Sequence, residues 1–268
     1  RIIRELLLGI DIGTSNVKAT LFNLTGEIIS AASKEYPTSR PKLNWAEQNP
    51  EDWWTILCSI LNKLFKEKKE LSENIIAIGV SSQSWGCCPL SADGSCVRPA
   101  ITWMDRRATN ECNMIKKIVG SKYPISIDPS YIYPKILWIK KSEPENYTAT
   151  HKFINVAGYI NFRLTGTFIS DFSQEDPFQI AIRTITPGET EHLCKEIGID
   201  YEKLPSFSES FQIIGKVSKK ASSESGLRTG IPVIAGAMDT SAASLAVGSV
   251  DQGQAMYVAG QAGAIVVC

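Results

Sequence analysis

The sequence lacks an excess of charge of either sign and has very little histidine. Its 268 residues include 28 Lys and Arg against 28 Asp and Glu, and only two histidines, His151 and His192. A chain without a strong net field is poorly suited to hold nucleic acid or an anionic membrane. Two histidines leave few ligands for a Cys-His metal site. We therefore expect neither nucleic acid nor a membrane as a partner.

Long apolar runs and paired cysteine motifs are also missing. No hydrophobic run reaches the roughly 18 residues that a membrane-spanning helix needs, and residues 1–4 are too few for a signal peptide. The cysteines are odd in number and show no C-x-x-C spacing, which argues against a disulfide framework or a zinc site. They are Cys58, Cys87, Cys88, Cys96, Cys112, Cys194 and Cys268. We interpret them as reduced core residues of a cytoplasmic protein.

What is present is a clear strand and helix pattern in the first 80 residues. Residues 6–12 are apolar, residues 17–22 alternate at period two, and residues 28–31 follow a second tight turn. Three strands joined by tight turns predict an antiparallel meander. Asn49 and Pro50 then open a helix with apolar residues at helical spacing, and residues 75–80 read as a buried strand.

This order of elements predicts the fold class and the domains. Three strands, a helix and a further strand are the order of an α/β, ribonuclease H-like (actin-like ATPase) domain, with a mixed sheet flanked by helices. We assign residues 1–229 to this domain. A new strand at 231–235 and a small-residue helix predict that residues 230–268 begin a second, similar domain. Since the chain stops in an apolar run, we expect it to be part of a longer polypeptide.

One candidate site follows the first strand. Asp11 ends that strand, and Gly13, Thr14 and Ser15 form a small-residue turn whose backbone amides can converge on phosphate oxygens. Asp11 suits Mg²⁺, bound through water, and Lys18 adds positive charge. The alternative is an ordinary hairpin with turn-favouring residues.

A second candidate is Asp239, which follows another buried strand and begins a helix. It could be a helix cap, for which Asp is well suited. It could instead be the general base that accepts a proton from a hydroxyl attacking the γ-phosphate of ATP. Gly260 and Gln261 lie in a later Gly-rich turn, which reads either as a second phosphate turn or as a plain hairpin.

A third candidate supplies hydrogen-bonding and apolar groups of the kind that hold a sugar. Gln83, Ser84 and Trp85 come just after a strand, and Trp103 and Asp105 lie in a later polar segment. The alternative for both tryptophans is core packing, which is the commoner role of Trp.

Seven stretches in sequence order resemble the carbohydrate kinases whose best-known members are xylulokinase and glycerol kinase. The first is G-I-D-I-G-T-S at 9–15, and the sixth is G-A-M-D-T-S-A-A at 236–243. The others are residues 39–54, 103–107 (W-M-D-R-R), 134–138 (P-K-I-L-W), 158–166 and 260–263. Residues 39–54 are similar to xylulokinase in particular.

The resemblance implies an actin-like pair of domains with ATP and Mg²⁺ between them, the first binding the sugar and the second the nucleotide. It implies that Asp239 is the catalytic base and that Asp11 and Asp239 are the metal-binding carboxylates. The groups implied to face the phosphates are the turn at Gly13, Thr14 and Ser15, the side chain of Lys18, and the later turn at Gly260 and Gln261. The residues implied to line the sugar pocket are Gln83, Ser84, Trp85, Trp103, Asp105, Asp239 and Thr240.

The expected activity is phosphorylation of a ketose or polyol hydroxyl, xylulose-like, by a cytoplasmic enzyme that forms a homodimer. The chain has Ser84-Trp85 where xylulokinases carry Met-His and glycerol kinases carry Arg-Glu. It has Thr240 and Gln261 where the family usually has an amide and a Thr. Because of these differences, an alternative interpretation is a catalytically silent relative that binds sugar without phosphorylating it. An actin-like ATPase with a protein partner is a further alternative, against which the segments around Gln83 and Trp103 argue.

Overall fold

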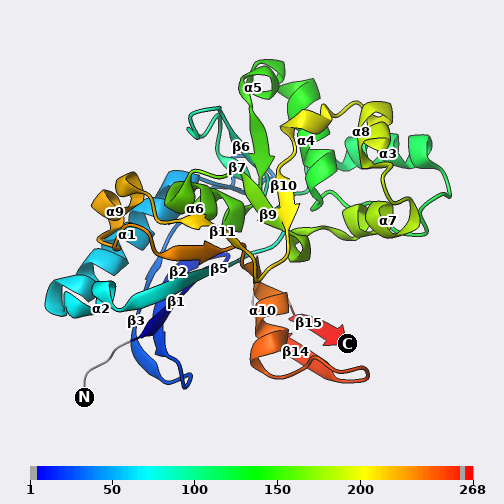
Figure 1. The fold of residues 1–268 in the computed structure, drawn as a ribbon. Coiled ribbons are helices and arrows are strands. Elements are labelled where there is room, and N and C mark those ends of the chain that lie inside the picture. Colours follow the sequence, from blue (N-terminus) through cyan, green and yellow to red (C-terminus); the bar gives the residue numbers. More distant parts are fainter. Residues whose placement is uncertain (1–4, 260–262, 268) are drawn as a thin grey trace.

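The computed structural model describes residues 5–259 and 263–267 and is built on one mixed sheet (Figure 1). Among these residues the sheet has seven strands, in the order β11-β12-β5-β1-β2-β3, with β13 also paired to β5. Their bounds are β1 Leu6–Ile12, β2 Asn16–Asn23, β3 Ile28–Glu35, β5 Ile75–Ser82, β11 Ile213–Lys216, β12 Pro232–Ile234 and β13 Ala237–Met238. Strands β1, β2 and β3 are antiparallel neighbours, which confirms the predicted meander, and β5 is parallel to β1.

One face of the sheet is covered by α1 (Pro50–Glu67), α6 (Val156–Thr165) and α9 (Lys219–Ser225). Alternate residues of β1, among them Leu8 and Ile10, are fully buried in this core, as period-two alternation requires. The helix predicted after Asn49 is α1, where the Asn49 side chain accepts a hydrogen bond from the Glu51 amide.

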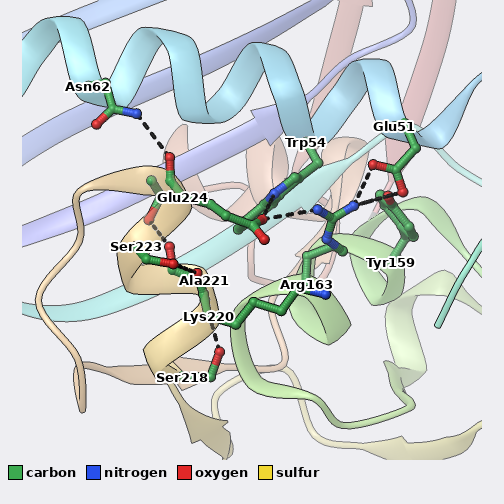
Figure 2. A network of polar contacts seen from close by, with 11 residues as sticks. Glu51, Trp54, Asn62, Tyr159, Arg163, Ser218, Lys220, Ala221, Ser223 and Glu224 are labelled. Atoms are coloured by element: carbon green, nitrogen blue, oxygen red, sulfur yellow. Dashed lines mark hydrogen bonds and ion pairs between the residues drawn. The ribbon is translucent and has the colours of Figure 1, made fainter. Parts of the chain in front are cut away.

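A polar network joins these three helices (Figure 2). Arg163 of α6 contacts Glu51 of α1 at 2.7 Å and Glu224 of α9 at 3.1 Å. Glu224 also accepts a hydrogen bond of 2.5 Å from the Trp54 indole of α1. Residues more than 100 positions apart in sequence are therefore fixed against one another.

A second core lies between the helices that occupy most of residues 109–197 (Figure 1). These are α3 (Thr109–Val119), α4 (Ile132–Ser142), α5 (Pro144–Ala149), α7 (Pro177–Ile185) and α8 (Thr190–Ile197). Short elements complete the fold: β4 Glu47–Gln48, α2 Glu70–Glu73, β6 Cys88–Leu90, β7 Ala100–Ile101, β8 Lys152–Ile154, β9 Ile169–Asp171, η1 Phe172–Gln174, η2 Tyr201–Lys203 and β10 Ser206–Ser208.

The segment after residue 230 begins within the main sheet. Strands β12 and β13 pair with β5, so residues that we assigned to a second domain extend the first sheet. They are followed by α10 (Asp239–Ala246) and by the antiparallel pair β14 (Ala255–Ala259) and β15 (Gly263–Val267), which form a separate two-stranded sheet (Figure 1). Where a second domain begins stays a prediction.

Two further expectations from the sequence concern the cysteines and membrane-spanning helices. Cys58, Cys87, Cys88, Cys96, Cys112 and Cys194 are free thiols, and all but Cys96 are buried. Across the described ranges, no helix is long and apolar enough to cross a bilayer.

Candidate active site

The two aspartates predicted from separate motifs meet at one edge of the sheet. In the parallel pairing, Asp11 of β1 and Ala237 of β13 both lie level with Ser81 of β5. Asp239 comes two residues after Ala237, as the first residue of α10. Parallel strands that end together bring their following residues to one edge, and the charge of Asp239 acts on the carboxyl of Asp11.

Both carboxyl groups have raised pKa values because burial penalises their charged forms. For Asp11, Lys18 (3.9 Å away) and a hydrogen bond from Ser81 oppose this shift, whereas repulsion from Asp239 adds to it. For Asp239, hydrogen bonds from the amide (2.7 Å) and hydroxyl (3.3 Å) of Thr240 oppose it. A half-buried carboxylate pair of this kind attracts a cation.

The donor set at this edge fits Mg²⁺. Oδ1 of Asp11 is buried and has no hydrogen-bond partner within the described chain, so this oxygen is available to bind a ligand. Mg²⁺ usually binds through one or two carboxylates together with substrate phosphates and water. No cluster of three or more potential metal-ligating His, Cys, Asp or Glu side chains occurs in the part of the chain that is described. Asp11 is the residue that would hold the ion here, and the metal-binding role implied for Asp239 stays a prediction.

The turn after β1 is held rigidly by its carbonyl groups. Tyr36 donates its hydroxyl to the Gly13 carbonyl and its amide to the Ser15 carbonyl. The buried Gln48 donates to the Thr14 carbonyl at 2.9 Å. Fixing the carbonyls fixes the peptide planes and therefore the direction of the amides, which is what a phosphate-binding turn needs.

The predicted sugar segment lies directly beside this turn. The Gln83 amide group donates to the Gln48 side chain at 2.8 Å and to the Tyr36 hydroxyl at 3.3 Å. The indole of Trp103 donates to the Thr14 hydroxyl at 3.1 Å. Two residues predicted for the sugar and one predicted for phosphate thus share a single hydrogen-bonded unit with the turn.

Trp85 has an unusual backbone for its type, with φ of 49°. Lys135 holds it there by donating to the Trp85 carbonyl at 2.7 Å, and the ring packs edge-on against Tyr131. The indole N–H of Trp85 and Oε1 of Gln83 are buried without a partner in the described residues. Unpaired buried donors and acceptors are the groups that a hydroxyl-rich ligand satisfies. Ser84, between them, is half-buried.

Asp105 differs from the other predicted sugar residues, because its carboxylate is already engaged. It accepts hydrogen bonds from the Ala46 amide at 2.6 Å and from Arg107 at 2.7 Å and 2.9 Å, and it is 1% exposed. Arg107 in turn packs over the Trp45 ring at 3.6 Å. These contacts favour an architectural role over the direct sugar contact that the sequence suggested.

Several residues of the site escaped the sequence analysis. Tyr36, Gln48 and Lys135 carry no motif of their own, although Gln48 and Lys135 lie inside family-like stretches that could have drawn attention to them. The predicted contacts of Gly260 and Gln261 fall outside the described residues.

The geometry agrees with the family relationship. Residues 6–246 match the FGGY family of carbohydrate kinases, N-terminal domain. The chain belongs to the FGGY family of carbohydrate kinases. It is 30% identical over 261 residues to the xylulose kinase of Escherichia coli (strain K12), covering 96% of this chain and 53% of that protein. The xylulose kinase of Bacillus subtilis (strain 168) is 31% identical over 266 residues, with 97% and 53% covered.

Solved structures of this FGGY chain's relatives share its fold. A xylulose kinase from Rhodospirillum rubrum has a TM-score of 0.87 at 27% identity, covering 98% of this chain and 56% of that one. A gluconate kinase from Lactobacillus acidophilus has a TM-score of 0.86 at 25% identity, with 97% and 53% covered. These structures confirm the mixed α/β, actin-like fold with flanking helices. The FGGY chain spans about half the length of the curated relatives it matches.

Proposed function

We propose that this chain carries the sugar-binding part of an ATP-dependent kinase that phosphorylates a hydroxyl of a ketose or polyol. The observation that carries the proposal is the convergence of Asp11 and Asp239 at one edge of the sheet, beside the fixed turn after β1. Phosphoryl transfer needs a positioned acceptor hydroxyl, a carboxylate near it and neutralisation of phosphate charge. FGGY membership supplies the reaction class.

Asp239 is the general base in this proposal. At the first position of α10 it is half-buried, and its raised pKa makes it a better proton acceptor than an exposed aspartate. Asp11 would hold Mg²⁺, which when bound would offset the charge of the ATP phosphates. Lys18 and the amides of Thr14 and Ser15 orient the γ-phosphate toward the sugar, whereas the Gly13 amide closes the turn by donating to the Asn16 carbonyl at 3.0 Å.

The sugar lies against Gln83, Ser84 and Trp85 in this proposal, with Trp103 at the junction between sugar and phosphate. Support comes from the unpaired Gln83 Oε1 and Trp85 indole N–H, which suit a polyhydroxylated ligand. Xylulose kinases among the relatives make a xylulose-like ketose the first substrate to try. The cytoplasmic location, the homodimer and the absence of a nucleic-acid partner stay predictions.

The test is a coupled assay of ADP release on the full-length protein with a panel of ketoses, polyols and aldoses. Asp239→Asn should lower kcat roughly 10² to 10⁴-fold, the usual contribution of a general base. Asp251→Asn, the same change at an exposed loop aspartate, is the matched control and should leave kcat unaltered. Sugar binding without turnover by the wild-type protein would instead indicate a silent sugar-binding relative.

The pH dependence of kcat/KM, which reports groups of the unliganded enzyme, gives an independent prediction. A base works only when deprotonated, and burial raises the pKa of Asp239. The rate should therefore be full above that pKa and decline as the pH falls through it. The decline should set in at a higher pH than the ordinary aspartate value of 3.8 allows. A rate that stays constant down to the pH where the protein unfolds would contradict this assignment.

A further inference from the structure

One short turn touches the backbone beside both candidate site segments. The turn is η1 (Phe172–Gln174), and it packs against β13. The Ser173 hydroxyl accepts a hydrogen bond of 2.8 Å from the amide of Met238, the residue before Asp239. The Gln174 side chain donates at 3.1 Å to the Ser82 hydroxyl, beside Gln83.

A buried carboxylate fixes the direction of the Ser173 hydroxyl. Asp171 is fully buried, and its Oδ1 accepts both the amide of Ser173, at 2.9 Å, and its hydroxyl proton. A serine hydroxyl has one proton. Because that proton goes to Asp171, the oxygen lone pairs are left to accept the Met238 amide. Oδ1 also accepts from Ser210 at 3.4 Å, and the Ser210 carbonyl accepts the Gly236 amide at 3.0 Å.

The start of α10 needs this external support. Its N-cap residue is Met238, and the amide of an N-cap residue has no acceptor within its own helix. Gly236, two residues earlier, has φ of 85° and lies so close to the Val80 carbonyl that any Cβ would be 2.0 Å away. The chain therefore turns sharply just before Asp239, and the Met238 amide donates to the hydroxyl of Ser173, a residue outside α10.

We propose that Asp171 and Ser173 are positioning residues for the kinase reaction, which hold the Met238 amide and thereby aim the Asp239 carboxylate at the sugar hydroxyl. This inference rests on the proposed function of Asp239. Asp171 acts through Ser173, and neither residue touches the substrate. A displaced base loses rate while binding continues, since a misplacement of about 1 Å can cost roughly 10²-fold in rate.

The experiment compares Ser173→Ala, which removes the acceptor, with Ser173→Thr, which keeps a hydroxyl. The control is Ser223→Ala on α9, where the serine bonds only the Lys220 carbonyl of its own helix among the described residues (Figure 2). Sugar-dependent ADP release should show kcat lowered about 10 to 100-fold by Ser173→Ala, with KM for sugar and ATP within about twofold. Ser173→Thr should recover most of the rate, and Ser223→Ala should match the wild type.

A second readout is independent of catalysis. Hydrogen exchange at the Met238 amide should be faster in Ser173→Ala than in Ser223→Ala, because that amide loses its acceptor. If Ser173→Ala does not fold, Ser173→Cys takes its place, since a thiol is only a weak acceptor. It should show the same losses in smaller degree.

The outcomes separate the two proposals. If the wild type is inactive with every sugar, the kinase proposal fails. Hydrogen exchange at the Met238 amide would then test only the hydrogen bond between Met238 and Ser173. An active wild type with unchanged kcat in the Ser173→Ala or Ser173→Cys variant would overturn the positioning role. So would equal losses in Ser173→Ala and Ser173→Thr, or unchanged exchange at Met238.

Discussion

At the scale of single residues, the most unusual group in the fold is the side chain of Lys135. It is fully buried on α4 and donates to the carbonyls of Trp85 (2.7 Å) and Ser130 (2.6 Å). Burial lowers its pKa from 10.5 to about 8, although Cys87, Asp105 and Asp176 partly oppose the shift. Burying an ammonium group here costs stability. In return, its hydrogen bond to the Trp85 carbonyl stabilises the left-handed backbone of Trp85.

Lys135 should therefore give a measurable pH dependence of stability. Between about pH 8 and 10.5 the native state has lost a proton at Lys135 that the unfolded chain still holds, so the contribution of Lys135 to the free energy of unfolding should rise with pH. Buried thiols such as Cys87 and Cys194, whose pKa values are raised to about 11, act in the opposite direction, so the Lys135 contribution is read as a difference between wild type and variant. The full rise amounts to about 3 kcal/mol by linkage.

Urea unfolding of the wild type and of Lys135→Met across this range measures the effect. The difference in free energy of unfolding between wild type and Lys135→Met should grow in favour of the wild type as the pH rises through this range, and Lys140→Met, on the same helix but half-exposed, controls for the loss of a lysine. Parallel stability curves for wild type and Lys135→Met would show that Lys135 stays protonated throughout.

At the scale of elements, local sequence patterns predicted the longer strands and helices well. β1 and α1 lie within a few residues of their predicted bounds, because period-two burial and the Asn49-Pro50 start act locally. Two-residue strands such as β4 and β13 could not be predicted, because they exist only through their partners β7 and β5. The strand predicted at 231–235 was found as β12, whereas its neighbours in the sheet required the tertiary structure.

The connection between β12 and β13 requires glycine at position 236. Gly236→Ala would place a Cβ 2.0 Å from the Val80 carbonyl at a positive φ, so we expect a loss of about 3 kcal/mol or more in stability. Gly230 has φ of 87° but nothing within 4 Å of such a Cβ. Gly230→Ala should therefore cost only about 1 to 2 kcal/mol. Equal shifts in unfolding midpoint for the two variants would exclude the steric explanation.

At the scale of the whole molecule, the Arg163 network of Figure 2 ties distant parts of the chain together. Arg163 is 14% exposed and contacts Glu51, Glu224 and the Tyr159 hydroxyl. Arg163→Met should lower the free energy of unfolding by about 1 to 2 kcal/mol, because it removes a charged donor from the buried Tyr159 hydroxyl, while Glu51 and Glu224, at 47% and 33% exposed, are partly solvated.

Arg106 offers the matched comparison for that substitution. It forms a two-point ion pair with Asp128, at 2.6 Å and 2.8 Å, but is 47% exposed. Arg106→Met should cost at most about 1 kcal/mol, since solvent screens the pair. Chemical denaturation of both variants measures the difference, and a smaller effect at Arg163 than at Arg106 would contradict the role of burial.

The sequence by itself determined the family, the opening meander, α1 and the position of each candidate aspartate, because turn residues, periodicity and motif order are local properties. Only the tertiary structure decided which residues meet. It brought Asp11 beside Asp239, joined Gln83 to Gln48 and Tyr36, engaged Asp105 with Arg107, and placed Ser173 against Met238. Such contacts join residues up to about 230 positions apart, and they depend on strand register and packing, which no local pattern specifies.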